Sequence, residues 1–323
     1  MAATIKDVAR DTKLSVATVS NYINGIPVRP ENEVKIRESI ERLGYRVNHI
    51  ARGLKVNCSY TLGVIIPFFD DIFHLQKIAA IEEYVSRFGY NLLVCGCRGD
   101  HDIMLQKIHF LTEKQVDGIF IDPLLNDDGS AEWEKELQEL QIPVIVFDQM
   151  LEGEYDTILT NNEEISHKIV EHLISKGHKR IAILSGPNGN YTADKRLAGY
   201  ESALKEHGIP LSDNLIYRGD FSTKSGRDGF IELFSHKEKP TALFASNYHY
   251  TTGALLAAYE LGIDINRDLE IFSFDNYEMS HICKPPLSVA VQPINEIGKS
   301  GAKLMLKRLQ KDYTDFPCIE VLP

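Results

Sequence analysis

From residue 60 onward, short apolar runs alternate with longer stretches whose apolar positions follow a helical period. Such runs have the length of buried strands, and their alternation with helices predicts βαβ units and parallel sheets covered on both faces. The runs are too numerous for one compact sheet, so we expect two doubly wound α/β lobes. The predicted strands are Leu62–Ile66, Asn91–Cys95, Gly118–Asp122, Val144–Asp148, Ile181–Ser185, Ala242–Ala245, Ile271–Asp275 and Ser288–Val291.

A predicted helix in the first lobe illustrates the helical period. It spans residues 72–88, and its apolar residues are expected on related faces. These residues are Ile72, Leu75, Ile78, Ile81, Val85 and Phe88.

The first 45 residues show a different pattern, that of short amphipathic helices. We expect a helix behind the N-cap Thr4, a turn at residues 12–14, and a second helix that begins at Ser15 and stops at Asn24-Gly25. A third helix is expected over Pro30–Leu43. The head is therefore predicted to be all-α, with a helix-turn-helix.

In a helix-turn-helix, the second helix enters the major groove of DNA and its N-terminal residues face the base edges. Here Val16, Ala17 and Asn21 would face the bases, with Ser15 and Thr18 near phosphates. The asparagine side chain can pair bidentately with adenine. The pattern alone leaves open a three-helix packing module without a DNA role.

Charge separates the head from the rest of the chain. The whole chain has a formal charge of −11, yet residues 1–57 hold 10 Lys+Arg against 6 Asp+Glu, which leaves 25 Lys+Arg against 40 Asp+Glu in the remainder. A small basic head on a large acidic body is typical of a polyanion-binding module with a separate body. We expect only the head to approach DNA, because the body is repelled by it.

Three segments in sequence order carry a resemblance to a known family: TIKDVARDTKLSVATVSNYING, ERLGYRVNHIARGLK and TLGVIIP. The chain resembles the lactose-repressor type (LacI/GalR) family of bacterial transcription regulators over essentially its whole length. The resemblance implies a head and hinge over residues 1–57 and a two-lobed, periplasmic-binding-protein-like effector-binding and dimerisation domain over residues 58–323. The implied N-lobe covers about 60–160 with a return near 292–312, and the C-lobe about 161–291.

The resemblance also implies a hinge helix at residues 48–55 that orders on operator DNA. Leu54 would wedge into a base step of the minor groove, although a core position is the alternative for this residue. Ala51 would let two backbones approach, while Arg52 and Lys55 would meet phosphate or the narrow groove. The predicted DNA-contacting residues are Ser15, Val16, Ala17, Thr18, Asn21, Asn24, Ala51, Arg52, Leu54 and Lys55.

Polar residues at the ends of the apolar runs predict a ligand site, because ligands of such sheets bind beyond the carboxyl ends of the strands. Carboxylates and arginine bind pairs of hydroxyls and an aromatic ring stacks on a sugar face, so we expect a small sugar or sugar derivative. For Arg196 and Asp275 the alternative is an internal ion pair or a strand-end cap. Asp148 and Asp275 end apolar runs, Asn247 follows one, and Phe221 follows Gly219-Asp220, whereas Phe73, His74, Thr192 and Arg196 are the positions that the family resemblance implies. The predicted ligand-contacting residues are Phe73, His74, Asp148, Thr192, Arg196, Phe221, Asn247 and Asp275.

Some positions depart from the family pattern. Lys13 occupies a turn position where the family usually has Gly or Asn, at a cost of about 1 kcal/mol if the backbone is left-handed there. Asp71-Ile72 stands in place of Asn-Pro, and Tyr248 in place of Asp. Asn190 stands where purine-responsive relatives have Arg, so a purine is a less expected effector. The family usually continues with a further strand after the position of Pro323, so the end is either truncated or lacks that strand.

Other functional classes lack their motifs in this sequence. There is no GxGxxG after the first strand, no GxxxxGK[ST], no GxSxG and no HExxH, so we expect neither an enzyme nor a cofactor or metal. The odd, scattered cysteines indicate reduced, structural thiols. No apolar run approaches the roughly 18 residues of a membrane span, and the start does not resemble a secretory signal, so we expect a cytoplasmic protein with no membrane partner.

Together these features predict a transcription regulator, in particular a repressor, that acts as a homodimer on double-stranded operator DNA under the control of a small molecule. The alternative is a solute-binding protein with the same body fold and no DNA role. That alternative would require export and would not need residues 1–57.

Overall fold

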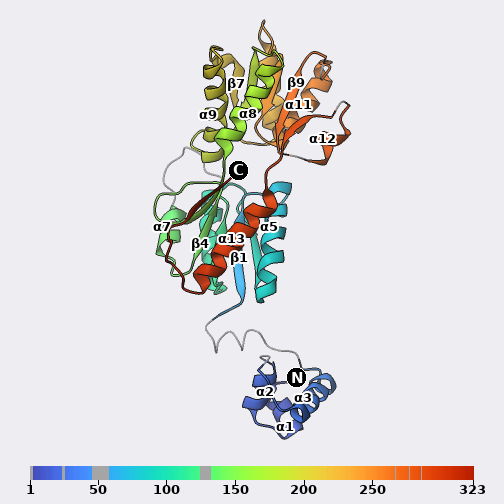
Figure 1. Cartoon of the computed structure of the whole chain (residues 1–323), viewed down its shortest axis with the longest axis vertical. Helices are drawn as coiled ribbons and strands as arrows, with labels where there is room; N and C mark the ends of the chain where they lie inside the picture. Colours follow the sequence, from blue (N-terminus) through green and yellow to red (C-terminus); the bar gives the residue numbers. More distant parts are fainter. Residues whose placement is uncertain are drawn as a thin grey trace. The chain divides into compact units, whose positions relative to one another are not determined.

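The computed structural model describes residues 3–23, 26–45, 58–123, 132–265, 267–275, 277–284 and 286–323. The chain forms two compact units, Met1–Ser59 and Tyr60–Pro323 (Figure 1). The terms head and body are kept for residues 1–57 and 58–323. Within the described residues the head is helical and the body is α/β, so the predicted fold class is confirmed.

The head packs its helices around a small apolar core in which Val8, Val19 and Ile36 are fully buried. Asp11 links the first and third helices, because it accepts a hydrogen bond from Ser39 and pairs with Arg42. The helices are α1 (Ile5–Thr12), α2 (Val16–Ile23) and α3 (Pro30–Leu43).

The start of α1 is capped as predicted, whereas the predicted stop of α2 at Asn24-Gly25 lies outside the described residues. The backbone N–H of Thr4 donates to the Asp7 carboxylate at 2.9 Å, which satisfies a free donor at the start of α1. Lys13 ends α1 in the left-handed region, with φ 55°, so the strained turn considered from the sequence is present. Gly44 ends α3 with φ 60°, which glycine adopts without strain.

The body contains two parallel sheets, one in each lobe (Figure 1). The N-lobe sheet has the order β11-β5-β4-β3-β1-β2, and the C-lobe sheet has the order β10-β9-β8-β6-β7. The N-lobe strands are β1 (Thr61–Ile66), β2 (Asn91–Gly96), β3 (Gly118–Ile121), β4 (Val144–Phe147), β5 (Asp156–Thr160) and β11 (Ile319–Leu322). The C-lobe strands are β6 (Ile181–Ser185), β7 (Ile216–Arg218), β8 (Ala242–Ala245), β9 (Glu270–Phe274) and β10 (Ser288–Ala290).

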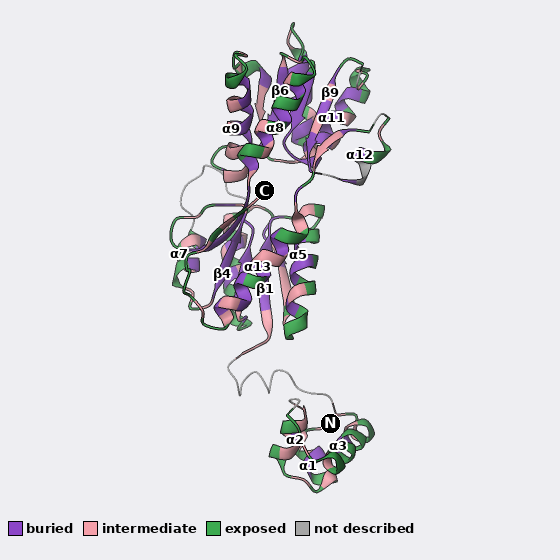
Figure 2. Cartoon of the chain, in the orientation of Figure 1, coloured by how far each residue is buried: buried purple, intermediate pink, exposed green. Residues whose placement is uncertain are grey.

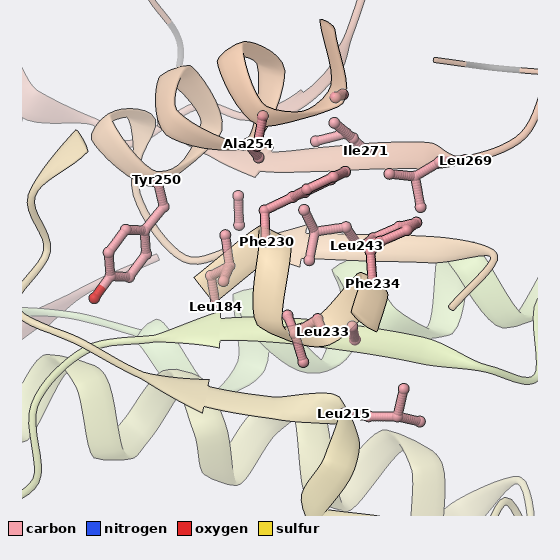
Figure 3. Close-up of a cluster of buried hydrophobic side chains, with 14 of the residues drawn as sticks. Leu184, Leu215, Phe230, Leu233, Phe234, Leu243, Tyr250, Ala254, Leu269 and Ile271 are labelled. Carbon is pink, nitrogen blue, oxygen red and sulfur yellow. The ribbon is translucent and has the colours of Figure 1, made fainter. Parts of the chain in front are cut away.

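Helices cover both faces of each sheet, and the central strands are buried, whereas the edge strands β2, β7, β10 and β11 are only partly buried (Figure 2). In the C-lobe, α10 (Thr223–Ser235) and α11 (Tyr248–Leu261) enclose one apolar cluster against the sheet, with Phe230 and Phe234 stacked at 4.2 Å between ring centroids (Figure 3). The N-lobe helices are α5 (Ile72–Val85), η1 (Ser86–Phe88), α6 (His101–Glu113), α7 (Glu132–Glu139) and α13 (Ile294–Leu309). The C-lobe helices are α8 (Asn162–Ser175), α9 (Tyr191–Glu206), η2 (Asp213–Leu215), α10 (Thr223–Ser235), α11 (Tyr248–Leu261) and α12 (Glu278–Ile282).

The structure corrects some details of the predicted elements. Strands β5, β7 and β11 were not predicted, and β11 carries the N-lobe beyond its expected limit near residue 312. The predicted apolar face of α5 is also divided: Ile81 and Val85 are buried in the core, whereas Ile72 and Leu75 are exposed.

A buried ion pair fastens the end of the chain to the N-lobe. The guanidinium of Arg308 in α13 donates two hydrogen bonds to Asp156 of β5, at 2.7 and 2.8 Å, and both side chains are almost wholly inaccessible to solvent. Asp156 also accepts the backbone N–H of Cys318 at 2.9 Å, and Arg308 reaches Asp315 at 2.7 Å. These contacts join α13, β5 and the segment that leads into β11.

Candidate functional site

One face of α2 in the head is exposed and made of small or polar side chains. Ser15, Val16, Ala17 and Asn21 are exposed and Thr18 is half-buried, while Val19 on the opposite side is in the core. The Ser15 hydroxyl accepts the backbone N–H of Thr18 at 3.1 Å and caps the helix, as predicted. Small side chains let a helix come close to base edges, so the geometry suits a recognition helix.

The remaining predicted DNA contacts lie outside the described residues. These are Asn24, Ala51, Arg52, Leu54 and Lys55. Their roles stay predictions.

The body has a cleft of about 480 Å³ at the carboxyl ends of the strands, with walls from both lobes. This volume is within the range of small-molecule sites. The structure brings all eight predicted ligand-contacting residues into the wall of this cleft. The location of the residues is therefore as expected, while their contact with a ligand stays a prediction.

Several cleft residues have a strained backbone. Arg98, Asp148, Phe221 and Asp275 adopt φ values of 58°, 54°, 68° and 76° within three residues of the ends of their strands. The left-handed region costs a residue with a Cβ atom about 1 kcal/mol or more. Strain of this kind concentrates at functional sites, where it sets the direction of particular side chains.

Arg196 and Asp275 are the two buried charges of the C-lobe wall. The Arg196 guanidinium donates to Asn162 at 2.8 Å and to the Ser246 carbonyl, and it stacks 3.6 Å above the Phe274 ring. Asp275 accepts a hydrogen bond from Gln292. Burial raises the pKa of Asp275 and lowers that of Arg196, so the protein satisfies neither charge completely. Both groups are thus suited to bind hydroxyls of a ligand.

The N-lobe wall contains a second charged group that was only partly predicted. Lys77 is buried, pairs with Asp122, and reaches the Asp148 carboxylate at 2.9 Å. Nδ1 of His74 lies 2.8 Å from Asp122. Burial alone would lower the pKa of His74, but the attraction of Asp122 outweighs it and the pKa is raised. The ion pair between Lys77 and Asp148 also holds the Asp148 carboxylate in place at the cleft.

Two members of this group were missed from the sequence. Asp122 ends its apolar run in the same way as Asp148 and Asp275, so the strand-end rule could have selected it. Lys77 gave no comparable signal, since a lysine within an amphipathic helix is usually solvated.

The two lobes touch across the cleft. The Thr192 hydroxyl donates to the backbone carbonyl of Asp148 at 2.9 Å. The Tyr248 hydroxyl accepts the backbone N–H of Ile72 at 3.2 Å and lies 3.4 Å from the Asp71 carboxylate. Asp71-Ile72 and Tyr248 were identified as separate departures from the family pattern, and the structure shows that they contact each other.

Asn247 and Phe221 have structural partners in the cleft wall. The Asn247 carbonyl oxygen accepts the backbone N–H of Tyr250 at 2.8 Å, and its amide donates to the Phe221 carbonyl at 2.9 Å. Asn247 therefore caps α11 and holds the loop of Phe221, and any contact it makes with a ligand must use its remaining hydrogen-bonding capacity.

Two other kinds of site are not found in the part of the chain that the structure describes. No group of three or more His, Cys, Asp or Glu side chains there could hold a metal ion. None of the helices there is long and apolar enough to span a membrane. Cys97 is buried, which raises the pKa of its thiol to about 11 and keeps it protonated.

Comparison with known proteins agrees with the fold. Residues 59–317 match the family model described as periplasmic binding proteins and sugar binding domain of the LacI family. Catabolite control protein A of Priestia megaterium is 34% identical over 324 residues, which cover 99% of this chain and 97% of that protein. The ribose operon repressor of Escherichia coli is 30% identical over 323 residues, which cover 99% of this chain and 97% of that protein.

A solved structure of the Lac repressor dimer, bound to operator and the anti-inducer ONPF, matches with a TM-score of 0.88 and 25% identity, over 100% of this chain and 97% of that one. The relatives are transcription regulators and match this chain over the head as well as the body. The protein is therefore a ligand-controlled, DNA-binding repressor and not an enzyme, and the alternative of a free solute-binding protein is not supported. The chain belongs to the LacI family of transcription regulators.

Proposed function

We propose that the head, residues 1–57, binds a specific double-stranded operator and that a sugar or sugar derivative in the cleft controls this binding. The observation that carries the proposal is the convergence of predicted ligand-contacting side chains from both lobes in the wall of one cleft. A regulator of this kind acts in the bacterial cytoplasm, on the nucleoid when it is bound to DNA.

On the operator, α2 enters the major groove with Val16, Ala17 and Asn21 toward the bases. The exposed, small face of α2 supports this orientation. Asn21 is the polar base reader of this face, and Leu54 of the hinge adds the minor-groove wedge that the family resemblance implies.

In the cleft, Arg196 and Asp275 bind hydroxyls, and the rings of Phe73 and Phe221 provide apolar faces against a sugar ring. Because both lobes line the cleft, a sugar that binds better to one arrangement of the lobes changes the population of that arrangement. DNA affinity then changes by the coupling free energy between the two sites.

We further propose that the protein is a homodimer, which places two recognition helices about 34 Å apart on a near-palindromic operator. Large apolar side chains are exposed on the body, and α5, α11 and α12, which carry several of them, lie toward the same side in Figure 1. They include Ile72, Leu75, Leu256, Tyr259 and Ile282. Exposed apolar side chains of this size can be buried in a subunit interface, which supports the proposal.

The proposal is tested by selecting bound duplexes from a random pool with the full chain, and then measuring the affinity of residues 58–323 for the enriched sequence. We expect removal of the head to reduce that affinity by about 1,000-fold or more, because specific contacts and the basic charge are lost together. The body should keep its thermal shift with a sugar. If the shortened chain binds the enriched duplex as tightly as the full chain, the proposed DNA role of the head is wrong.

Asn21→Ala is expected to weaken binding to the enriched duplex by about 5- to 30-fold, because one bidentate base contact contributes on the order of 1–2 kcal/mol. Binding to unrelated DNA should change little. The comparison is a titration of both duplexes at one salt concentration, with Asn32→Ala, at a half-buried asparagine in the first turn of α3, as the control. An equal loss on both duplexes would remove the base-reading role of Asn21.

Tyr259→Asp combined with Ile282→Asp is expected to convert the dimer into monomers at micromolar concentration, since these side chains are 87% and 68% exposed in the single chain and a charge there disfavours an apolar interface. Sedimentation velocity measures the change. Leu211→Asp, at another exposed apolar position, is the control. A double variant that stays dimeric would place the interface elsewhere.

A further inference from the structure

The charges of the cleft wall are strongly unbalanced. Among the described residues that line the cleft there are six aspartates and two arginines. Lys77 adds one positive charge directly behind this wall. The aspartates are Asp70, Asp71, Asp122, Asp148, Asp220 and Asp275.

The buried positive charges are already engaged by the protein. Lys77 forms ion pairs with both Asp122 and Asp148. Arg196 donates one hydrogen bond to Asn162 and one to the Ser246 carbonyl. Arg98 is exposed at the cleft, where it is one cation against the two exposed carboxylates of Asp70 and Asp220. An anionic ligand would therefore find weak compensation from the cations and would face several carboxylates.

The helix N-termini at the cleft also offer little to an anion. A helix N-terminus binds phosphate through its free backbone N–H groups and its positive dipole. Four helices begin at this cleft, and in each the capping side chain lines the cleft and accepts a first-turn N–H. The caps are Asp71 for α5, Asn190 for α9, Ser222 for α10 and Asn247 for α11.

Asp71 strengthens this effect because it puts a negative charge at the start of α5, where a phosphate would otherwise bind. Its carboxylate accepts the Phe73 N–H at 2.8 Å and faces the opposite lobe, with His249 at 3.8 Å and the Tyr248 hydroxyl at 3.4 Å. His74, whose pKa is raised, also lines the cleft, but its ring nitrogens lie 3.7 Å from Asp71 and 2.8 Å from Asp122. The cationic groups near Asp71 are therefore paired with aspartates of the protein.

From this wall of carboxylates and internally capped helices, we propose that the cleft selects an uncharged sugar and rejects its phosphate ester. The inference rests on the proposed sugar-binding function and makes it more specific. Hydroxyl groups can donate to the carboxylates and accept from Arg196, whereas a phosphate oxygen can only accept. Two like charges about 4 Å apart repel by about 1 to 4 kcal/mol, depending on the surrounding dielectric.

The test is a thermal-shift and titration series on the full chain with matched pairs: glucose and glucose 6-phosphate, ribose and ribose 5-phosphate, and cellobiose as an uncharged disaccharide. Nucleosides complete the panel. We expect at least one uncharged sugar to raise the melting temperature, with its phosphate ester at least tenfold weaker in dissociation constant. This difference should narrow as salt is added, because salt screens the repulsion.

Asp70→Asn combined with Asp220→Asn supplies the matched variant, since both side chains are exposed at the cleft and asparagine keeps an acceptor oxygen. We expect the preference for the uncharged sugar to fall about 3- to 10-fold in this variant. Glu139→Gln, an exposed position at the end of α7 that does not line the cleft, should leave it unchanged.

Each result decides between the proposals. A phosphate ester that binds as tightly as its parent sugar, or more tightly, overturns the charge selection while the sugar-binding function stands. A response to nucleosides alone, or to nothing in the panel, overturns the sugar class and with it this inference. Loss of DNA selectivity after removal of the head is a separate measurement and is unaffected by either outcome.

Discussion

Replacing Arg308 with methionine is expected to destabilise the body by about 3–5 kcal/mol, because it leaves the Asp156 carboxylate buried without its partner. Both side chains are nearly inaccessible, and two hydrogen bonds join them. The same change also releases Asp315 and the Asp312 carbonyl, which hold the segment before β11. A fall in the midpoint of urea unfolding, with faster proteolysis near the C-terminus, is the expected result.

Two further variants separate the loss of a partner from the loss of packing. Arg267→Met removes an ion pair that is mostly exposed, and it should leave the unfolding midpoint nearly unchanged. The double variant Arg308→Met with Asp156→Leu should recover part of the stability, since an apolar pair can replace a buried ion pair. If the double variant is no more stable than Arg308→Met alone, the buried unpaired carboxylate is not the cause of the loss.

Asp275→Asn is expected to weaken the binding of the best sugar in the panel by about 100-fold, since hydrogen bonds to a charged group contribute about 1.5–3 kcal/mol. The fold should persist without ligand, because asparagine retains an acceptor for Gln292. The thermal shift with sugar should disappear while the melting temperature of the free protein stays at or slightly above that of the original chain. Asp264→Asn, exposed in the loop after α11, is the matched control.

The raised pKa of Asp275 fixes the direction in which stability and sugar affinity change with pH. Burial raises the pKa of Asp275 in the folded state, so ionising this group costs stability, and the cost appears as the pH rises above the unfolded value. The Asp275→Asn variant cannot ionise at this position and avoids that cost.

Sugar affinity in the original chain should fall as the pH is lowered through the raised pKa of Asp275, because the protonated carboxyl group loses an acceptor. An unchanged affinity profile in calorimetric titrations would exclude Asp275 from ligand contact.

The sequence predicted the fold class and the residues of the cleft because both depend on periodic apolar runs and on the polar residues at their ends. Asp148 and Asp275 were identifiable since each directly ends an apolar run. Strand β5 was missed because Asp156–Thr160 is short and includes polar residues, although it is wholly buried in the sheet. The burial of its Asp156 is explained by Arg308, which is 152 residues away in the sequence.

The rest of the site depends on contacts between distant segments. The periodicity of residues 72–88 placed a helix correctly, but it could not show that Ile72 and Leu75 face outward while Lys77 faces the core. Pairing of Lys77 with Asp122 and Asp148 exists only after three segments have packed together. Residue type and spacing therefore indicated where a ligand would bind, whereas the charge balance of the cleft required the assembled structure.

The bridge from Tyr248 to Asp71 and Ile72 also bears on the rate at which a bound ligand is released. This bridge and the contact from Thr192 to Asp148 join the lobes, so if the proposed sugar is enclosed between them, its release requires these contacts to break. The lifetime of the bound state is then set partly by the opening of the lobes and only partly by the contacts that hold the sugar. Under the proposed function, a cell that uses this regulator would respond to the disappearance of the sugar with a delay that the bridge helps to determine.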